Sequence, residues 1–574
     1  MKQKPGAMHV AKIERRHGDR IYVSHLVRRS VREGKRVRHE TIANVSKLPA
    51  AAIEALSAAL RGEALLGGAE SLRIERSLPA GHAEAVLGAA RRLGLPRLLD
   101  RSPSKQRDLA LAMICQRLLS PGSKLATVRA LHQSTLGAEL GVEDADQDDL
   151  YSAMDWLLER QEGIEGRLAK RHLTDGTLVL YDVSSSYFEG RTCPLAARGY
   201  SRDGKRGYLQ VTYGLLCDPE GHPVAIEAFA GNRVDHQTLI AQVEKLKQRF
   251  GLKSVIVVCD RGMATRANLE AIAEAEGMGW ITALSAPAVK RLVKDGDLQL
   301  SLFDEQNLAE ISSDAYPGER LVLCRNPLLG QERTRKRSEL LAATEAELEA
   351  IAERVKAGSL RGAAEIGLAV GPALKRYKVK KHFEVAITDA SLHFSRKQAQ
   401  IEAEAALDGI YVLRTSVPDS ELAAPNIVHS YKQLKWAERA FRSFKGPLEV
   451  RPIHHRLPER VRAHLLICML SYYLEFHLRE AWAELTFRDE CPPMQPDPVA
   501  KAERSASATA KARTKRTSGG EVPHSFESLI VELSLRTRNT VRLGDSEAGF
   551  ERLSEPNPVQ MRALELLERI PKQA

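Results

Sequence analysis

The hydrophobic pattern divides the chain into a short extended start, a helical stretch and a long alternation of strands and helices. From 50 to 175, apolar residues recur at three- and four-residue spacing, which predicts a series of helices. These helices are expected over 50–61, 82–94, 106–119, 123–134 and 148–171. Ser120-Pro121-Gly122 separates two of them, and Ser123 is placed to cap the second. Such helix pairs occur in DNA-binding units and in ordinary helical cores, so the pattern alone leaves both interpretations open.

The pattern changes near residue 177, where short apolar runs begin to alternate with turns. Strands are predicted over 178–182, 208–217 and 222–229, with a turn at Asp218-Pro219-Glu220-Gly221 joining the last two. A helix over 235–250, a strand over 254–260, a helix over 265–276 and a strand over 280–284 follow. This order predicts an α/β, ribonuclease-H-like mixed sheet with helices on both faces. In that fold the ends of the first and fourth strands are neighbours, so Asp182 and Asp260 are expected to meet.

Residues 285–408 are expected to be a large insertion, with a charged helix over 338–356 and a strand over 382–388. A strand over 410–415 then returns to the sheet, and helices are predicted over 430–446 and 459–480.

The helix over 431–445 carries a polar stripe. Tyr431, Glu438 and Lys445 are seven residues apart, and at 100° per residue this spacing places them on one face. The apolar positions occupy the neighbouring face, so Glu438 is expected to project toward the sheet. Two aspartates and one glutamate form an all-oxygen site, which suits two Mg²⁺ or Mn²⁺ ions. The competing interpretation gives each carboxylate an ordinary role, as a turn residue or as a surface ion pair.

Charge is concentrated at the start of the chain. The whole sequence has a net charge of +11, and residues 1–50 hold 13 Lys/Arg against 4 Asp/Glu, which is +9. The segment 20–45 predicts a basic β-hairpin around Glu33-Gly34-Lys35 that binds DNA phosphates. The cations expected to make these contacts are Arg28, Arg29, Lys35 and Arg36. The alternative is a charged edge ribbon that resists aggregation.

Composition excludes several classes of protein. The 43% hydrophobic content excludes a wholly disordered chain, and no apolar run approaches the ~20 residues of a membrane span. The N-terminus lacks the apolar stretch of a secretory signal. Seven cysteines without a C-x-x-C pair predict buried thiols in a reducing cytosol. The stretch 501–520 has six Lys/Arg, one acid and no apolar period, which predicts a flexible linker.

Five segments together resemble the DDE-type insertion-sequence transposases whose catalytic helix carries Tyr-x2-Arg-x3-Glu-x6-Lys. They are YDVSSSYFEG (181–190), GNRVDHQTL (231–239), VIVVCDRGM (255–263), DGIYVLRTS (408–416) and YKQLKWAERAFRSFK (431–445). The resemblance implies that Asp182, Asp260 and Glu438 are the catalytic, metal-binding triad. Leu434 stands where the motif has arginine, so that contact cannot be carried over; Lys435 or Arg442 could replace it.

The resemblance also implies an activity and its partners. A transposase of this group would use two Mg²⁺ or Mn²⁺ ions, bind terminal inverted repeats in double-stranded DNA as a homodimer, and join the cut ends to target DNA. It would act in the bacterial cytosol, at the nucleoid. The residues expected to contact DNA near the triad are Tyr431, Lys445, Arg261 and Arg442. Two alternatives remain: a nuclease of the same fold that cuts without joining, and a DNA-binding repressor derived from a transposase.

The expected domains combine the pattern with the resemblance. They are a basic DNA-binding hairpin (1–48), a helical region for DNA binding or dimerisation (49–175), a catalytic core in two parts (176–284 and 409–490), an insertion (285–408), and a flexible linker with the C-terminal region (491–574). Three smaller features receive ordinary roles: Ser184–Ser186 as hydrogen-bonding loop residues, His454-His455 as part of a surface loop, and Asp235 as a helix cap.

Overall fold

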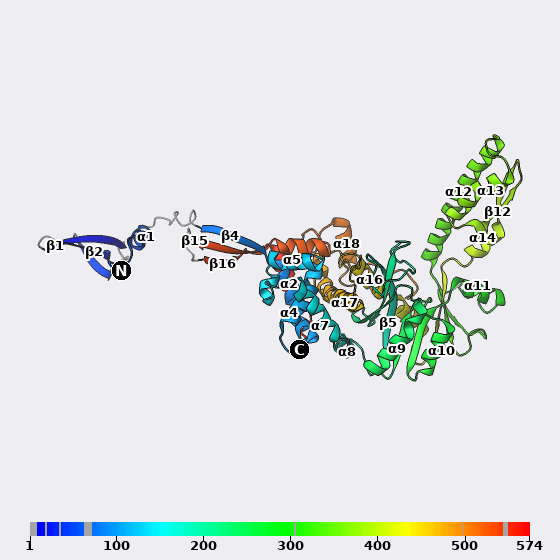
Figure 1. Cartoon of the computed structure of the whole chain (residues 1–574), viewed down its shortest axis with the longest axis horizontal. Helices are drawn as coiled ribbons and strands as arrows, with labels where there is room; N and C mark the ends of the chain where they lie inside the picture. Colours follow the sequence, from blue (N-terminus) through cyan, green and yellow to red (C-terminus); the bar gives the residue numbers. More distant parts are fainter. Residues whose placement is uncertain are drawn as a thin grey trace. The chain divides into compact units, whose positions relative to one another are not determined.

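The computed structural model describes residues 8–17, 20–33, 36–61, 72–303, 306–495, 497–543 and 549–573. The chain forms two compact units, one of Met1–Leu78 with Thr537–Glu555 and the other of Pro79–Arg536 with Pro556–Ala574. Figure 1 labels their helices and strands.

The first unit contains two small sheets. Strands β1 (Met8–His17), β2 (Arg20–Glu33) and β3 (Arg36–Asn44) form an antiparallel sheet in that order, so the predicted hairpin is present and β1 adds a third strand. Helix α1 (Ala50–Leu60) follows. Strand β4 (Leu72–Pro79) pairs with strands from near the C-terminus, in the order β16 (Gly549–Leu553), β15 (Thr537–Leu543), β4.

The second unit is built on an eight-stranded mixed sheet. Its strands in spatial order are β10 (Leu308–Ile311), β11 (Arg320–Arg325), β14 (Ile410–Thr415), β9 (Met278–Ala283), β8 (Val255–Cys259), β5 (Thr177–Phe188), β6 (Leu209–Cys217) and β7 (Pro223–Ala230). Strands β5, β6 and β7 are antiparallel, whereas β8 and β9 run parallel to β5. This is the predicted ribonuclease-H-like order. Successive residues of β5 and β8 are buried, so helices cover both faces of the sheet.

One long helix joins the helical region to this sheet. Helix α17 (Pro458–Ala481) is buried along most of its length because it packs on β7 and on three helices of the N-terminal region. Those helices are α2 (Gly81–Arg92), α4 (Lys105–Leu119) and α7 (Gln147–Glu159). The two regions therefore share one hydrophobic core, although the sequence suggested a domain boundary near 175. The remaining helices of this region are α3 (Leu95–Leu99), α5 (Lys124–Gln133), α6 (Leu136–Leu140) and α8 (Gln161–His172).

The inserted segment is shorter than predicted. Strands β10 and β11 belong to the main sheet, because the apolar side chains of Leu321 and Leu323 are buried there. The part with its own small core follows from residue 327. It consists of α12 (Pro327–Lys356), α13 (Ala363–Arg376), β12 (Phe383–Ile387), β13 (Leu392–Arg396) and α14 (Gln398–Ala405).

Several local predictions need correction. The helix expected over 148–171 is two helices that meet at Arg160, and the one over 235–250 is a 3-10 turn, the short α9 (Leu239–Glu244) and a π-helical turn. The expected linker 501–520 contains α18 (Ala506–Thr514), whose Lys511 is buried and donates to the carbonyl oxygens of Ala483 and Thr486. A buried lysine therefore holds this segment in place. The segment lacks the apolar periodicity from which a packed helix could have been predicted.

The remaining elements of the second unit complete its surface. They are α10 (Arg266–Glu274), α11 (Ala286–Asp295), α15 (Ala424–Lys432), α16 (Lys435–Lys445), α19 (Phe526–Ser534) and α20 (Pro558–Glu565). All seven cysteines are free; six are buried as predicted, and Cys491 is exposed. Among the described helices, none combines the length and apolar character that crossing a bilayer requires.

Candidate active site

The parallel pairing of β5 with β8 brings Asp182 and Asp260 to neighbouring positions. Tyr181 lies opposite Cys259 in this pair, and each aspartate is the next residue along the chain. Adjacent strands are about 4.8 Å apart, so the two backbones are close at this edge. Asp182 is half-buried within β5, whereas β8 ends at Cys259 and leaves Asp260 exposed. The predicted adjacency of Asp182 and Asp260 is therefore confirmed, but β5 does not end at Asp182 as predicted, because it continues to Phe188 in its pairing with β6.

Helix α16 brings Glu438 to the same place. The helix packs on β5 and β6 through its aromatic side, where Phe441 and Phe444 contact the ring of Tyr213 at centroid distances of 5.6 and 6.3 Å. Glu438 is exposed on the edge of this buried side, as its helical position predicted. It lines a cavity of about 540 Å³ together with Asp182.

Electrostatics connect the three carboxylates. The pKa of Asp182 is raised to about 7, chiefly by burial and also by the carboxylates of Asp260 and Glu438, while the backbone N–H of Val183 and the guanidinium of Arg202 act in the opposite direction. A carboxyl that is desolvated and faces two others is poorly stabilised as an anion without a cation. The three carboxylates are the oxygen donors that a hard divalent ion prefers, although their ligand atoms do not all lie within 4.8 Å of one another in this structure.

An arginine and a fourth carboxylate were missed as site residues. Arg202 lines the cavity with Asp182, and its Nη2 donates to both carboxylate oxygens of Asp235. A Cβ added at Gly262 would lie 3.8 Å from Asp260 Oδ2 and 4.0 Å from Asp235 Oδ2, so these carboxylates face the same space. The capping role expected for Asp235 is wrong, because its side chain caps no helix and binds Arg202 instead. Its place in the resembling segment 231–239 was the available signal.

Lys445 is held by a buried acid that the sequence did not single out. Its Nζ lies 2.9 Å from Oδ1 of Asp203, whose side chain is fully buried, and Arg451 pairs with the same oxygen. Asp203 also accepts a hydrogen bond from the backbone N–H of Tyr187. Burial lowers the pKa of Lys445, while Asp203 favours its charged form. Lys445 and Arg451 both line the cavity that contains Asp182 and Glu438.

The prediction of one continuous helix over 431–445 is wrong. Helix α15 ends at Lys432 and α16 begins at Lys435, so Tyr431 does not share a helix with Glu438 and Lys445. At the break, Lys432 Nζ donates to the carbonyl oxygen of Ala500, and Leu434 is buried. Tyr431 still lies near the carboxylates. Burial raises the pKa of its phenol, and the neighbouring carboxylates of Asp260 and Glu438 contribute to this rise.

The other predicted contacts are distributed over both units. Arg442 is exposed and lines the cavity beside Glu438, and Arg261 is exposed next to Asp260. Arg28 and Arg29 lie on β2 with half-buried side chains. Lys35 lies outside the described residues, and Arg36 begins β3.

The serines after Asp182 bond as expected, although they belong to β5 and not to a loop. Ser185 Oγ donates to the carbonyl oxygen of Tyr200, and Ser186 Oγ lies 2.9 Å from the hydroxyl of Tyr213.

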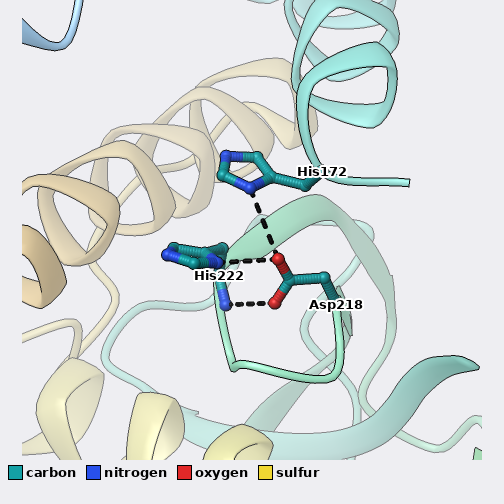
Figure 2. A group of neighbouring side chains, drawn as sticks. All are labelled: His172, Asp218 and His222. Atoms are coloured by element: carbon teal, nitrogen blue, oxygen red, sulfur yellow. Dashed lines mark hydrogen bonds and ion pairs between the residues drawn. The ribbon is translucent and has the colours of Figure 1, made fainter. Parts of the chain in front are cut away.

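A separate cluster joins α8 to the β6–β7 turn (Figure 2). His172, Asp218 and His222 form the one group of His, Cys, Asp and Glu in the described chain whose ligand atoms converge, within 4.8 Å, closely enough for a shared ion. Asp218 Oδ2 lies 2.7 Å from His222 Nδ1 and 3.3 Å from His172 Nδ1, and Oδ1 accepts the backbone N–H groups of Gly221 and His222. Burial opposes ionisation of Asp218, but the two imidazoles hold its pKa below the ordinary value. These bonds account for the arrangement, which stabilises the predicted turn.

Comparisons with known proteins agree with this architecture. Residues 174–474 match the family model "Transposase DDE domain", and residues 10–70 match the model "IS1634 family transposase, N-terminal domain". The comparison with curated proteins found no match.

Two solved structures are similar to parts of the chain. A piggyBac transposase synaptic complex with hairpin DNA shares 10% identity over 79% of this chain and 78% of its own, with a TM-score of 0.31. A Mos1 transposase paired-end complex with the left transposon end shares 16% identity over 30% of this chain and 62% of its own, with a TM-score of 0.15. The DDE match alone covers more than half of the chain and contains all three carboxylates, and the IS1634-type match precedes it. The chain therefore belongs to the DDE-domain transposases and is an insertion-sequence transposase.

Proposed function

We propose that Asp182, Asp260 and Glu438 form the catalytic centre of this transposase and hold two Mg²⁺ or Mn²⁺ ions. The observation that carries the proposal is the environment of Asp182, whose desolvated carboxyl interacts with the other two carboxylates beside an open cavity. A divalent cation would offset the repulsion among these groups. When bound, such ions activate a water or a 3′-hydroxyl and stabilise the leaving oxygen.

The surrounding cations would position DNA. Arg442 and Lys445 line the cavity beside Glu438, so they can hold phosphates on either side of the bond to be cut. Arg202 binds Asp235 and favours the ionised form of Asp182, which keeps the carboxylate ready for a cation. The hydroxyls of Ser185 and Ser186 are occupied by hydrogen bonds, so the reaction proceeds without a serine nucleophile.

The reaction we propose is cut-and-paste transposition. The N-terminal basic sheet binds the terminal inverted repeats, and the core hydrolyses a phosphodiester bond at each end and joins the freed 3′-hydroxyls to target DNA. Two ends must be joined together, which favours a homodimer on DNA.

The catalytic proposal is tested with Asp182→Ala and a duplex carrying the element's own terminal repeat. The variant is expected to lose Mg²⁺-dependent cleavage while it binds the duplex as tightly as the wild type. Glu274→Gln, an exposed carboxylate change on α10, is the matched control and is expected to cleave normally. Cleavage retained by purified Asp182→Ala would refute the site. Pre-cleaved ends then separate the alternatives, because a nuclease without joining activity would give no strand-transfer product.

A further inference from the structure

Another cavity of the second unit is basic and is lined by none of the three carboxylates of the proposed catalytic centre. Its volume is about 670 Å³, and it is formed where the start of α5 meets the segment between α16 and α17. Five cations line it against one carboxylate, that of Glu449. The five are Arg117, Lys124, Arg451, Arg456 and Arg460. The imidazoles of His455 and His464 do not add to this charge, since burial lowers the pKa of His455 to about 3 and holds that of His464 well below its ordinary value.

Lys124 is the strongest sign that this cavity takes an anion. Lys124 is only 8% exposed. Within the described chain, no hydrogen bond or ion pair holds its ammonium group, which lines the cavity. A buried charge without a partner is costly. Burial, with a further contribution from Arg117, accordingly lowers the pKa of Lys124 to about 8.

The neighbouring groups are also incompletely satisfied. Arg117 donates to the carbonyl oxygen of Gly122 and contacts His464, but its buried Nε has no partner among the described atoms. Arg460 stacks on Tyr151 at 4.3 Å, and its Nε is likewise unsatisfied. Ser123 caps α5, so the positive end of that helix dipole also points to this region.

The basic cavity adjoins the proposed active site through one residue. Arg451 lines both this cavity and the one that contains Asp182 and Glu438, and its guanidinium is fixed by Asp203. A DNA strand held at the triad would therefore continue past Arg451 toward Lys124.

We propose that the basic cavity binds a backbone phosphate of the DNA strand that continues beyond the bond cut at the triad. The inference rests on the proposed function, because it needs that bond to lie at Asp182 and Glu438. One phosphate would supply the counter-charge that Lys124, Arg117 and Arg456 lack, with hydrogen bonds strengthened by charge on both partners. The same cations could also hold free inorganic phosphate, which the test distinguishes.

The test combines two protein variants with a scan of the DNA backbone. Terminal-repeat duplexes are prepared with one neutral methylphosphonate at successive positions along the strand, and their dissociation constants are measured with wild type, Lys124→Met and Arg456→Gln. The matched control is Lys170→Met, an exposed lysine of α8 that does not line the cavity. Circular dichroism and thermal melting verify that each variant is folded.

One position is expected to behave unlike the others. There the methylphosphonate should weaken wild-type binding roughly 10-fold and add almost nothing in Lys124→Met, because both changes remove the same contact. Lys124→Met should also reduce the slope of log affinity against log salt by about one, whereas Lys170→Met should not show the coupling. Additive effects at every position would overturn the proposal. A second result would also overturn it: inorganic phosphate raises the melting temperature of wild type but not of Lys124→Met, while the methylphosphonate and the lysine change stay additive at every DNA position. That result would indicate a site for a small anion.

The two proposals fail in different ways. Cleavage by Asp182→Ala would contradict the assignment of the catalytic carboxylates, whatever the result of the methylphosphonate scan. Additive effects of the methylphosphonate and of Lys124→Met on DNA affinity would contradict the phosphate site, even when Asp182→Ala is inactive.

Discussion

Arg202 donates to both carboxylate oxygens of Asp235, and this pair lies beside Asp182 and Asp260 of the proposed catalytic centre. The guanidinium of Arg202 is paired with Asp235, and its positive charge also lowers the pKa of Asp182 and so favours the ionised carboxylate. A pair outside the triad thus influences the charge state of a triad residue.

Arg202→Met is expected to raise the pKa of Asp182 above about 7, because a cation that favours its ionised form is removed. A divalent ion needs the carboxylate, so half-maximal Mn²⁺ binding should move to higher pH. Titration calorimetry at pH values from roughly 6 to 8.5, around that pKa, measures the shift. Arg198→Met, an exposed change in the same connection, should leave the profile unmoved. An unchanged profile in Arg202→Met would contradict the assignment.

Asp203→Asn is expected to lower the free energy of unfolding by about 3 kcal/mol, since it leaves Lys445 and Arg451 without their buried partner. Cleavage should fall as well, because Lys445 lines the triad cavity. Urea unfolding followed by circular dichroism gives the energy. Asp419→Asn is the control, since its carboxylate is 75% exposed in the pair with Arg320 and should contribute less than about 1 kcal/mol. Equal losses in both variants would count against the role of Asp203.

Asp218→Asn is expected to destabilise the protein at neutral pH, because the two imidazoles bond the ionised carboxylate. The pKa of Asp218 is lower in the folded chain than its ordinary value of 3.8, so its stabilisation is present above that value and declines as pH falls through the folded pKa. The difference in melting temperature between wild type and variant should therefore narrow below about pH 4. Asp295→Asn, an exposed change on α11, should show no such pattern.

Lys124→Met is expected to stabilise the DNA-free protein at pH 7 relative to wild type. The pKa of Lys124 is lowered from 10.5 to about 8, chiefly by burial and secondly by Arg117, with Cys468 opposing; His455 also faces it. Folding therefore disfavours the charged lysine below pH 8, and wild type regains stability as pH rises from 8 to 10.5. The regained amount is about 3 kcal/mol at about 1.4 kcal/mol per pKa unit. Melting curves of both proteins across this range measure it, and a pH-independent difference would contradict it.

The order of the apolar runs along the chain is enough to predict the central sheet and the position of the two aspartates. Apolar runs that end on Asp182 and Asp260 identify β5 and β8, and parallel pairing of the first and fourth strands then places the two aspartates on neighbouring backbones, although β5 itself continues to Phe188. The amphipathic spacing around Glu438 likewise placed it at the edge of a packed helix. These features are local periodicities combined with one topological rule, so they can be read from the chain.

The pairing of charged side chains around that sheet, by contrast, could not be predicted before the chain was seen folded. Asp203 meets Arg451 across 248 positions, and Arg117 meets His464 across 347, with no periodic signal linking either pair. The break before α16 has no signal in the sequence either, since Leu434 is compatible with a helix. Helix α15 ends at Lys432, whose ammonium group donates to the distant carbonyl oxygen of Ala500. Burial makes such long-range pairs selective, because an unpaired charge inside the protein is costly whereas the same charge on the surface is not.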